Sequence, residues 1–286
     1  MIQPLFEHRV KLAGFTTRVL ELEGDGTPIL FFHGYADSAD TWRLCLAELG
    51  RQGHRAIAVD LPGFGAADRL RSEPILPQLD AFAAASLDYL GGKEERVLAV
   101  GNSLGGCVAL RLAERRSSRL SGVVAVSPAG LQMSRLIALV ERDPVLRTLL
   151  ALPSPVPRAV IQGAVARLYR QLAFARPRSV DQAIVRAFTS HHKDRATVAG
   201  YLATAHRLLP ELHDPYRLDR ISTRILVVWG DRDRLVFHKG AERILQEVAG
   251  ARLELMPGVG HCPQVEAPDR FASILLDFSE ELSAVA

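Results

Sequence analysis

The sequence predicts an α/β fold: a mainly parallel, twisted sheet flanked by helices, with one helical cap inserted into it. Short apolar runs alternate with segments of helical periodicity through most of the chain, as in parallel strands joined by right-handed crossovers. Residues 131–220 break this alternation, because they contain four helical patterns and no strand pattern. We therefore expect a core domain formed by residues 1–130 and 221–286, and a cap (lid) formed by residues 131–220.

The strands follow from the spacing of apolar residues. Residues 5–23 alternate apolar and polar side chains, so we expect an antiparallel hairpin or edge that ends in a turn at residues 23–26. Uninterrupted apolar runs are typical of strands buried on both faces of a parallel sheet. Such runs occur at residues 28–32, 55–59, 97–100, 120–126, 225–229 and 252–256.

Helical periodicity fills the intervals between these strands. In the core it predicts helices at residues 77–90, 239–248 and 268–282, one that ends near Leu49 and one that follows Ser103. In the cap, apolar residues recur at helical spacing in four sets. These sets begin at Met133, Ile161, Val180 and Val198.

Composition and charge limit the classes of protein that fit. The 286 residues are 48% hydrophobic and 23% charged, which is ordinary for a soluble globular protein. A formal net charge of +3 gives no indication of nucleic-acid binding. No segment approaches the roughly 18 uninterrupted apolar residues of a membrane span, and no secretory leader pattern opens the chain. We expect a cytoplasmic monomer or homodimer that acts on a small molecule.

The cysteines give no sign of a metal site. Cys45, Cys107 and Cys262 are an odd set without metal-ligand spacing, and Cys107 lies on a helix face that we expect to be buried. We interpret all three as thiols and expect neither a metal nor another cofactor.

The segment GNSLGG, residues 101–106, lies between a predicted strand and a predicted helix. It matches G-x-S-x-G, a motif that requires this context. Such a sharp reversal holds its apex residue in a sparsely populated backbone conformation, and glycines on both sides remove collisions across the turn. Ser103 at the apex then lies just ahead of a helix N-terminus, where free N–H groups favour developing negative charge. Ser103 is therefore a candidate nucleophile.

A serine nucleophile needs a base, and the base needs an acid that orients it. Active groups of such a fold collect at the carboxyl ends of the parallel strands. His33 and His261 are the histidines that follow predicted strands there, and His261 is the better base because a flexible loop with two glycines precedes it. Asp231 and Asp233 follow another strand end and are the candidate acids.

Five motifs in this order resemble the α/β-hydrolase superfamily, in particular its capped members: HGYADSADTW, DLPGFG, GNSLGG, WGDRDRLV and GHCPQVEAPDRF. The resemblance covers nearly the whole chain except the cap. It implies a catalytic triad of Ser103, Asp233 and His261. It also implies an oxyanion hole formed by the backbone N–H groups of Tyr35 and Leu104.

The residues at particular positions of these motifs narrow the class of reaction that we expect. Epoxide hydrolases and haloalkane dehalogenases of this type carry aspartate at the elbow apex, where this chain has Ser103, so both activities are disfavoured. GNSLGG with Asn102 is similar to carbon–carbon hydrolases that cleave ring-fission products. Those enzymes usually have a glycine-rich loop after the first His-Gly and tryptophans after the catalytic histidine, whereas this chain has Tyr-Ala-Asp and Cys-Pro-Gln-Val.

The expected reaction is therefore hydrolysis of a carboxylic ester through an acyl-enzyme, since a triad and an oxyanion hole supply all that it needs. Carbon–carbon cleavage is one alternative. It also needs an anchor for an acidic tail, for which Asn102 and the cap residues Arg176, Arg178 and Arg186 are candidates. A small-molecule receptor that hydrolyses slowly is the other alternative.

The cap helices each offer one apolar stripe, so we expect a largely apolar pocket with few polar anchors. The candidate substrate contacts are His33, Gly34, Asn102, Met133, Leu136 and Phe188, and Phe32 and Phe64 are further candidate lining residues. Core packing is the alternative role for each apolar residue in this set.

Overall fold

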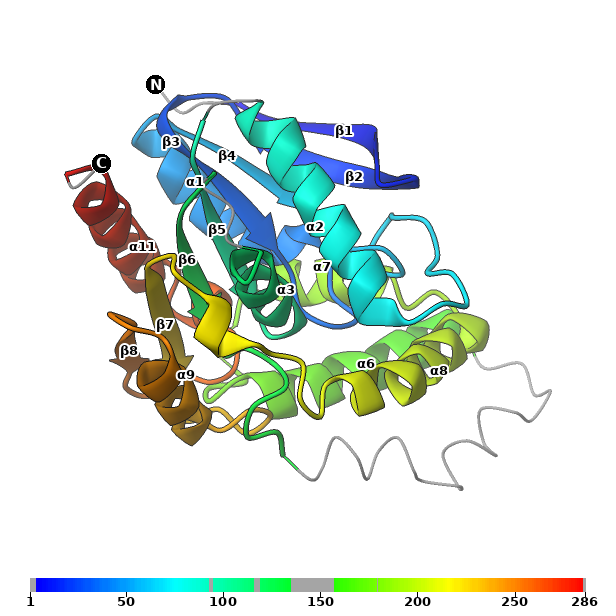
Figure 1. Ribbon diagram of the computed structural model, residues 1–286. Helices are drawn as coiled ribbons and strands as arrows, with labels where there is room; N and C mark the ends of the chain where they lie inside the picture. The colour runs from blue at the N-terminus through cyan, green and yellow to red at the C-terminus, as the bar shows by residue number, and fades with distance from the viewer. Residues whose placement is uncertain (1–3, 93–94, 116–118, 135–156, 179, 285–286) are drawn as a thin grey trace.

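One sheet runs through the molecule (Figure 1). The computed structural model describes residues 4–92, 95–115, 119–134, 157–178 and 180–284. Its strands are β1 (Leu5–Leu12), β2 (Phe15–Leu22), β3 (Asp25–Phe32), β4 (His54–Val59), β5 (Val97–Asn102), β6 (Leu120–Val126), β7 (Ile225–Gly230) and β8 (Arg252–Met256). They lie in the order β1-β2-β4-β3-β5-β6-β7-β8. The pairs β1–β2 and β2–β4 are antiparallel and the others are parallel, which confirms the predicted fold class.

Helices cover both faces of the sheet. Successive side chains of a strand point to opposite faces, so the strands contribute to two separate buried clusters. One cluster includes α2 (Ile75–Gly91), α3 (Leu104–Ala113) and α9 (Ala241–Glu247). The other includes α1 (Arg43–Arg51) and α11 (Pro268–Ser283). Four short elements complete the core: η1 (Ala39–Trp42), η2 (Leu218–Arg220), η3 (His238–Gly240) and α10 (Pro263–Glu266).

Between β6 and β7 the structure describes α6 (Arg158–Ala173), α7 (Gln182–Ser190) and α8 (Arg195–Glu211). We call residues 157–211 the helical insertion. In Figure 1, α6 and α8 lie across the end of the sheet toward which the parallel strands point. The insertion therefore adjoins the edge where the candidate catalytic residues follow their strands.

The chain leaves the core for the insertion and returns to it at one place. Tyr216, which lies between α8 and β7, donates its hydroxyl hydrogen bond to the carbonyl oxygen of Ala129, just after β6. Arg111 of α3 donates to the carbonyl oxygen of Pro215 beside it. Arg111 is itself held by Asp80 of α2 at 2.5 Å. The two ends of this excursion are thus fastened to each other and to the core.

The predicted strands are present, with small shifts of their bounds, and the expected antiparallel hairpin is formed by β1 and β2. The hairpin between β1 and β2 turns at Ala13 and Gly14, whose φ angles are 49° and 82°. Within the predicted turn at residues 23–26 the chain reverses direction, since β2 is antiparallel to β4 and β3 is parallel to it. Asp25 already begins β3 and donates its backbone N–H to Gly53 at 2.8 Å.

The predicted cap helices at residues 161–172, 180–188 and 198–208 correspond to α6, α7 and α8. The helix predicted from Met133 onward mostly falls outside the described residues, and Leu136 lies there too. Met133 itself forms an antiparallel bridge with Val236. Among the described helices, none has the length and apolar character needed to cross a membrane.

Candidate active site

Ser103 lies in the turn between β5 and α3, in the backbone conformation that the elbow motif requires. Its φ is 54° and its ψ is −113°, a conformation that costs a residue with a Cβ about 1–3 kcal/mol. A Cβ on Gly101 would lie 2.0 Å from the carbonyl oxygen of Gly105, and one on Gly105 would lie 2.1 Å from that of Phe32. Only glycine fits either position, so these two glycines permit the turn that leaves Ser103 partly exposed.

His261 and Asp233 form a buried pair, with His261 Nδ1 2.7 Å from Asp233 Oδ2. The same oxygen accepts a hydrogen bond from Trp229 Nε1 at 3.1 Å. Asp233 Oδ1 accepts from the backbone N–H groups of Leu235 and Val236 at 2.8 and 3.0 Å. Burial alone would raise the pKa of Asp233, but His261 and these N–H groups outweigh burial and lower it. An ionised Asp233 therefore holds one nitrogen of the imidazole and leaves Nε2 as the nitrogen that can exchange a proton.

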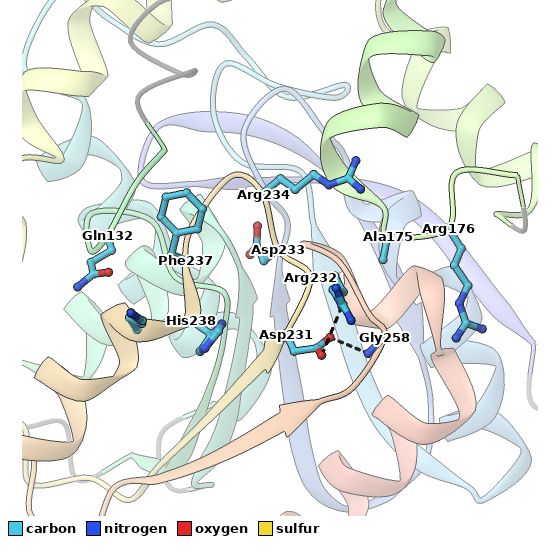
Figure 2. A pocket seen from close by; sticks show the side chains of 11 residues that line it. Gln132, Ala175, Arg176, Asp231, Arg232, Asp233, Arg234, Phe237, His238 and Gly258 are labelled. Atoms are coloured by element: carbon cyan, nitrogen blue, oxygen red, sulfur yellow. Dashed lines mark hydrogen bonds and ion pairs between the residues drawn. The ribbon is translucent and has the colours of Figure 1, made fainter.

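Asp231, the other candidate acid, binds a different part of the histidine loop. Its Oδ1 accepts from the backbone N–H of Gly258 at 2.6 Å, and its Oδ2 lies 3.7 Å from Arg232 Nε. Figure 2 shows both contacts. Of the two aspartates, Asp233 is therefore the one in contact with the His261 imidazole.

Asn102 connects the elbow to the histidine loop. Its Nδ2 donates to the carbonyl oxygen of His261 at 3.0 Å and, more weakly, to that of Val126 at 3.4 Å. Its Oδ1 lies 3.7 Å from Cys262 Sγ, and the side chain is buried. The amide NH2 of Asn102 therefore holds the backbone of His261 close to the elbow, and a contact of Asn102 with substrate stays a prediction.

The loop after β3 passes beside Ser103, as an oxyanion hole requires. A Cβ on Gly34 would lie 3.5 Å from the Cβ of Ser103. Tyr35 follows directly, and its hydroxyl donates to the carbonyl oxygen of Tyr201 in α8. Leu104 is the first residue of α3. The backbone N–H groups of Tyr35 and Leu104 thus come from the two segments that flank Ser103, and their role as oxyanion donors stays a prediction.

His33 is fully buried and shapes this loop. Its Nε2 accepts from the backbone N–H of Leu61 at 2.8 Å, so its Nδ1 carries the proton and donates to Gly34 O at 2.7 Å. Burial lowers the pKa of His33 to about 4, which keeps the ring neutral. Both ring nitrogens are bonded to the backbone, so His33 shapes the loop, and its contact with substrate stays a prediction.

Asp60, in the DLPGFG motif directly after β4, binds the segment that follows β3, although the sequence analysis gave it no role. Its side chain accepts from the backbone N–H groups of Ala39 and Ala66 at 2.7 and 2.8 Å. Arg18 of β2 bonds both Asp60, at 2.9 Å, and Asp40, at 2.7 Å. Burial favours a lower pKa for Arg18, but these two carboxylates raise it overall. The motif itself was the available signal, because an aspartate directly after a buried strand suits this kind of loop bonding.

Asp37 is a buried carboxyl group that sequence reasoning also passed over. It is 5% exposed, and burial raises its pKa to about 7. Its Oδ1 accepts from the backbone N–H of Ser38 at 2.8 Å. Burial, followed by the charge of Asp37, raises the pKa of Tyr169 in α6 well above its usual value. No sequence signal separates a buried aspartate here from an exposed one.

The candidate apolar contacts have packing partners. Phe188 of α7 is 8% exposed and stacks on Tyr169 with ring centroids 3.7 Å apart. Met133 Sδ accepts from the backbone N–H of Gly130 at 3.3 Å. Phe64 packs edge to face on Tyr35 with centroids 5.1 Å apart. The ring of Phe64 also lies 5.9 Å from that of Tyr201 in α8, which connects the core to the insertion. Contact of Met133 and Phe188 with substrate stays a prediction.

A pocket of about 810 Å³ lies on the outer side of the Asp233 loop (Figure 2). It differs from the predicted apolar pocket, since five basic side chains from two segments surround it and Ser103 does not line it. The lining residues are Gln132, Ala175, Arg176, Asp231, Arg232, Asp233, Arg234, Phe237, His238, Lys239 and Gly258.

The cysteines are free and buried, as predicted from their spacing. Burial raises the pKa of the Cys107 thiol to about 12. In the part of the chain that the structure describes, no three His, Cys, Asp or Glu side chains are grouped so that they could hold a metal ion.

Comparisons with known proteins give relatives of low identity and nearly full coverage. A 2-hydroxy-6-oxononadienedioate/2-hydroxy-6-oxononatrienedioate hydrolase of Comamonas testosteroni is 26% identical over 261 residues, which cover 89% of this chain and 88% of that one. A 2-hydroxy-6-oxo-6-(2'-aminophenyl)hexa-2,4-dienoic acid hydrolase of Metapseudomonas resinovorans is 27% identical over 283 residues, covering 95% and 90%.

Solved structures agree on the fold. A serine hydrolase involved in carbazole degradation superposes with a TM-score of 0.74 at 26% identity, covering 96% of this chain and 98% of that one. A thermophilic esterase superposes with a TM-score of 0.69, covering 98% and 99%, and at 20% identity it supports the fold alone. The family model described as "Alpha/beta hydrolase family" matches residues 29–274. The chain therefore belongs to the α/β-hydrolase family.

Proposed function

We propose that the protein is a serine hydrolase in which Ser103 is the nucleophile, His261 the base and Asp233 the orienting acid. The observation that carries this proposal is the 2.7 Å contact of His261 Nδ1 with Asp233 Oδ2. In addition, Asn102, the residue before Ser103, donates a hydrogen bond to the carbonyl oxygen of His261. The strained elbow at Ser103 supports the same assignment. The backbone N–H groups of Tyr35 and Leu104 would stabilise the oxyanion.

The proposed reaction has two halves. Ser103 Oγ bonds to the carbonyl carbon as its proton passes to His261 Nε2, and that proton then leaves with the alcohol oxygen when the ester bond breaks. Water next attacks the acyl-enzyme and gives its proton to His261, which returns it to Ser103 as the carboxylic acid departs. Asp233 stays ionised throughout and stabilises the protonated imidazole.

Carboxylic ester hydrolysis is the reaction that the site supports best. Carbon–carbon cleavage would need an anchor for an acidic tail, and the three candidate arginines, Arg176, Arg178 and Arg186, are all exposed. The amide of Asn102 is used to hold His261.

Carbon–carbon cleavage of a dienoate is the second candidate, because both curated relatives described above are named as hydrolases of 2-hydroxy-6-oxo acids. Identities of 26% and 27% favour a related class of substrate, but they do not decide between ester hydrolysis and carbon–carbon cleavage. A slowly hydrolysing receptor is the remaining alternative. The cytoplasmic location and the monomeric or homodimeric state expected from the sequence stay predictions.

We also propose that residues 131–220 form a cap over the site. The contact of Tyr35 with Tyr201 in α8, and the position of α6 and α8 across the end of the sheet, support this assignment. The rings of Phe64 and Tyr201 lie 5.9 Å apart between core and insertion, which suits an apolar substrate.

A labelling experiment followed by a substrate comparison tests the proposal. A fluorophosphonate probe should modify wild-type protein and Ser127→Ala equally, and should leave Ser103→Ala unmodified. Ser127 is a fair control because it also has a positive φ, 46°, at a strand end. p-Nitrophenyl esters of increasing chain length should turn over many times. Rapid turnover of a ring-fission dienone with negligible ester hydrolysis would reverse the choice of reaction, and a single slow burst would favour a receptor.

A further inference from the structure

Glu266, the last residue of α10, binds two segments of backbone at once. Its Oε2 accepts from the backbone N–H of Gly260 at 3.0 Å and from that of Ala175 at 3.0 Å. Its Oε1 accepts from the backbone N–H of Arg176 at 2.9 Å. Gly260 directly precedes His261, while Ala175 and Arg176 follow α6. One carboxylate therefore joins the histidine loop to the helical insertion.

The same two segments also bond each other. The backbone N–H of His261 donates to the carbonyl oxygen of Ala173 at 2.7 Å. They approach so closely that a Cβ on Gly260 would lie 2.6 Å from the oxygen of Ala173 and 2.7 Å from the nitrogen of Ala175. A larger residue than glycine would push the histidine loop away from the insertion.

His261 is consequently held by both of its backbone polar groups. Its N–H is bonded to the end of α6, and its carbonyl oxygen accepts from Asn102 beside the elbow at 3.0 Å. Its ring position relative to Asp233 depends on this backbone. A shift of the segment after α6 would therefore move the imidazole as well.

We propose that Glu266 is a positioning residue for His261, which locks the histidine loop to the segment after α6 and so couples the reactivity of Ser103 to the placement of the insertion. This inference rests on the proposed function. Carboxylate hydrogen bonds to N–H groups are about twice as strong as neutral ones. In Glu266→Gln the single amide oxygen can still accept a hydrogen bond. The amide NH2 group cannot accept, so at least one backbone N–H loses its acceptor and the histidine loop should relax.

Glu266→Gln and the matched control Glu254→Gln test the inference. Glu254 is an exposed glutamate on β8 that pairs with Arg270 at 3.4 Å. A displacement of about 1 Å in a catalytic group can cost about 100-fold. We expect Glu266→Gln to slow fluorophosphonate labelling of Ser103 and kcat by about 10-fold to 100-fold, with KM changed less than about 3-fold. Glu254→Gln should match the wild type.

The low-field proton resonance of the His261–Asp233 hydrogen bond gives a readout that a merely structural role would not move. We expect this signal in the wild type and in Glu254→Gln, and its loss or broadening in folded Glu266→Gln. Wild-type labelling speed together with an unchanged signal in Glu266→Gln would overturn the inference. If the wild type itself resists the probe, the proposed function fails instead.

Glu266→Asp keeps the charge but shortens the side chain, so it decides the question should Glu266→Gln fail to fold. It can still bond one of the two segments but not both at these distances. We expect it to fold and to label about 3-fold to 30-fold more slowly than the wild type. Labelling at the wild-type rate would overturn the positioning role.

Discussion

The carboxyl end of the sheet and the helical insertion use their polar groups differently. At the sheet end, both carboxylate oxygens of Asp233 and both ring nitrogens of His33 are bonded within the core. The insertion reaches this end largely through main-chain groups, such as the carbonyl oxygens of Ala173 and Tyr201, and also through His191, whose Nε2 lies 3.8 Å from Asp40 Oδ2. Its side chains near the site are mainly rings, including stacked Tyr169 and Phe188.

Because of this difference, we expect substitutions at the sheet end and in the insertion to have different effects. Groups at the sheet end are constrained by several bonds each, so a change there should reduce the chemical step itself. Near the site the insertion offers main-chain carbonyl groups and aromatic rings, neither of which belongs to the proposed triad. A change there should alter substrate preference or stability more than the rate of acylation.

Ser103→Ala should give the largest effect, because it removes the proposed nucleophile at the sheet end. We expect kcat for a p-nitrophenyl ester to fall by about 10³-fold to 10⁶-fold. Ser127→Ala, at the other strained serine, should retain most of the activity. Stopped-flow or steady-state assays of both variants, with circular dichroism to confirm folding, provide the measurement. Activity above a tenth of the wild-type value in Ser103→Ala would contradict the assignment.

Replacing the two aspartates one at a time separates orientation of the ring from support of its loop. Asp233→Asn removes the acceptor of His261 Nδ1 and should lower kcat by about 10⁴-fold. Asp231→Asn removes a charge that contacts the backbone N–H of Gly258 and Arg232, but not His261, and should lower kcat less than about 10-fold. The same esterase assay compares them. A dead Asp231→Asn beside a nearly normal Asp233→Asn would exchange their roles.

Asp37, which is buried in the loop after β3, should make stability depend on pH. Its pKa is 3.8 when unfolded and about 7 when folded. Between these values the unfolded chain has released a proton that the folded protein keeps, so the free energy of unfolding falls as pH rises from about 4 to 7. The loss from this group is at most about 4 kcal/mol and is complete above that range.

Asp37→Asn should remove that dependence while keeping the shape of the side chain. Urea unfolding at pH 4.5 and pH 8 measures it, since all other titrating groups are common to both proteins. We expect the variant to gain stability relative to the wild type as pH rises. Parallel pH curves for the two proteins would show that Asp37 ionises normally in the folded state.

The smallest effect is expected where a single hydroxyl joins the two regions. Tyr35→Phe removes the bond to the carbonyl oxygen of Tyr201, and Tyr216→Phe removes the equivalent bond to Ala129. Each should cost about 0.5–1.5 kcal/mol of stability. We expect only Tyr35→Phe to change the ratio of kcat/KM for short and long esters, by a few fold. Equal ratios in both variants would argue that the insertion does not select the substrate.

The sequence predicted the fold and the elbow well because both depend on local patterns. Buried strands require continuous apolar runs, and the elbow requires glycines two positions on either side of Ser103, so both leave signals within a few residues. Asp233 was separable from Asp231 only by resemblance. The hydrogen bonds that distinguish them depend on the loop geometry around Val236 and Gly258, which spacing alone does not specify.

Residues that act across long stretches of chain could not be predicted. Glu266 bonds the backbone of Arg176, 90 residues earlier, and Asn102 bonds that of His261, 159 residues later. Polar side chains at such positions look the same in sequence whether they face a ligand, the solvent or a distant backbone group. His33 and Asn102 were accordingly expected to touch substrate, although their polar atoms are bonded within the protein.

The hydrogen bond from Tyr216 to the carbonyl oxygen of Ala129 has a consequence for how the helical insertion can be replaced. The chain that leaves β6 and the chain that returns to β7 are bonded to each other there, so the helices between them begin and end at neighbouring positions on the core. Lengthening a closed loop costs only about 0.6 kcal/mol for each doubling of its length, so we expect the sheet to tolerate insertions of very different size at this position. We therefore expect that the segment between residues 130 and 215 can be replaced while the sheet and its strand ends are kept.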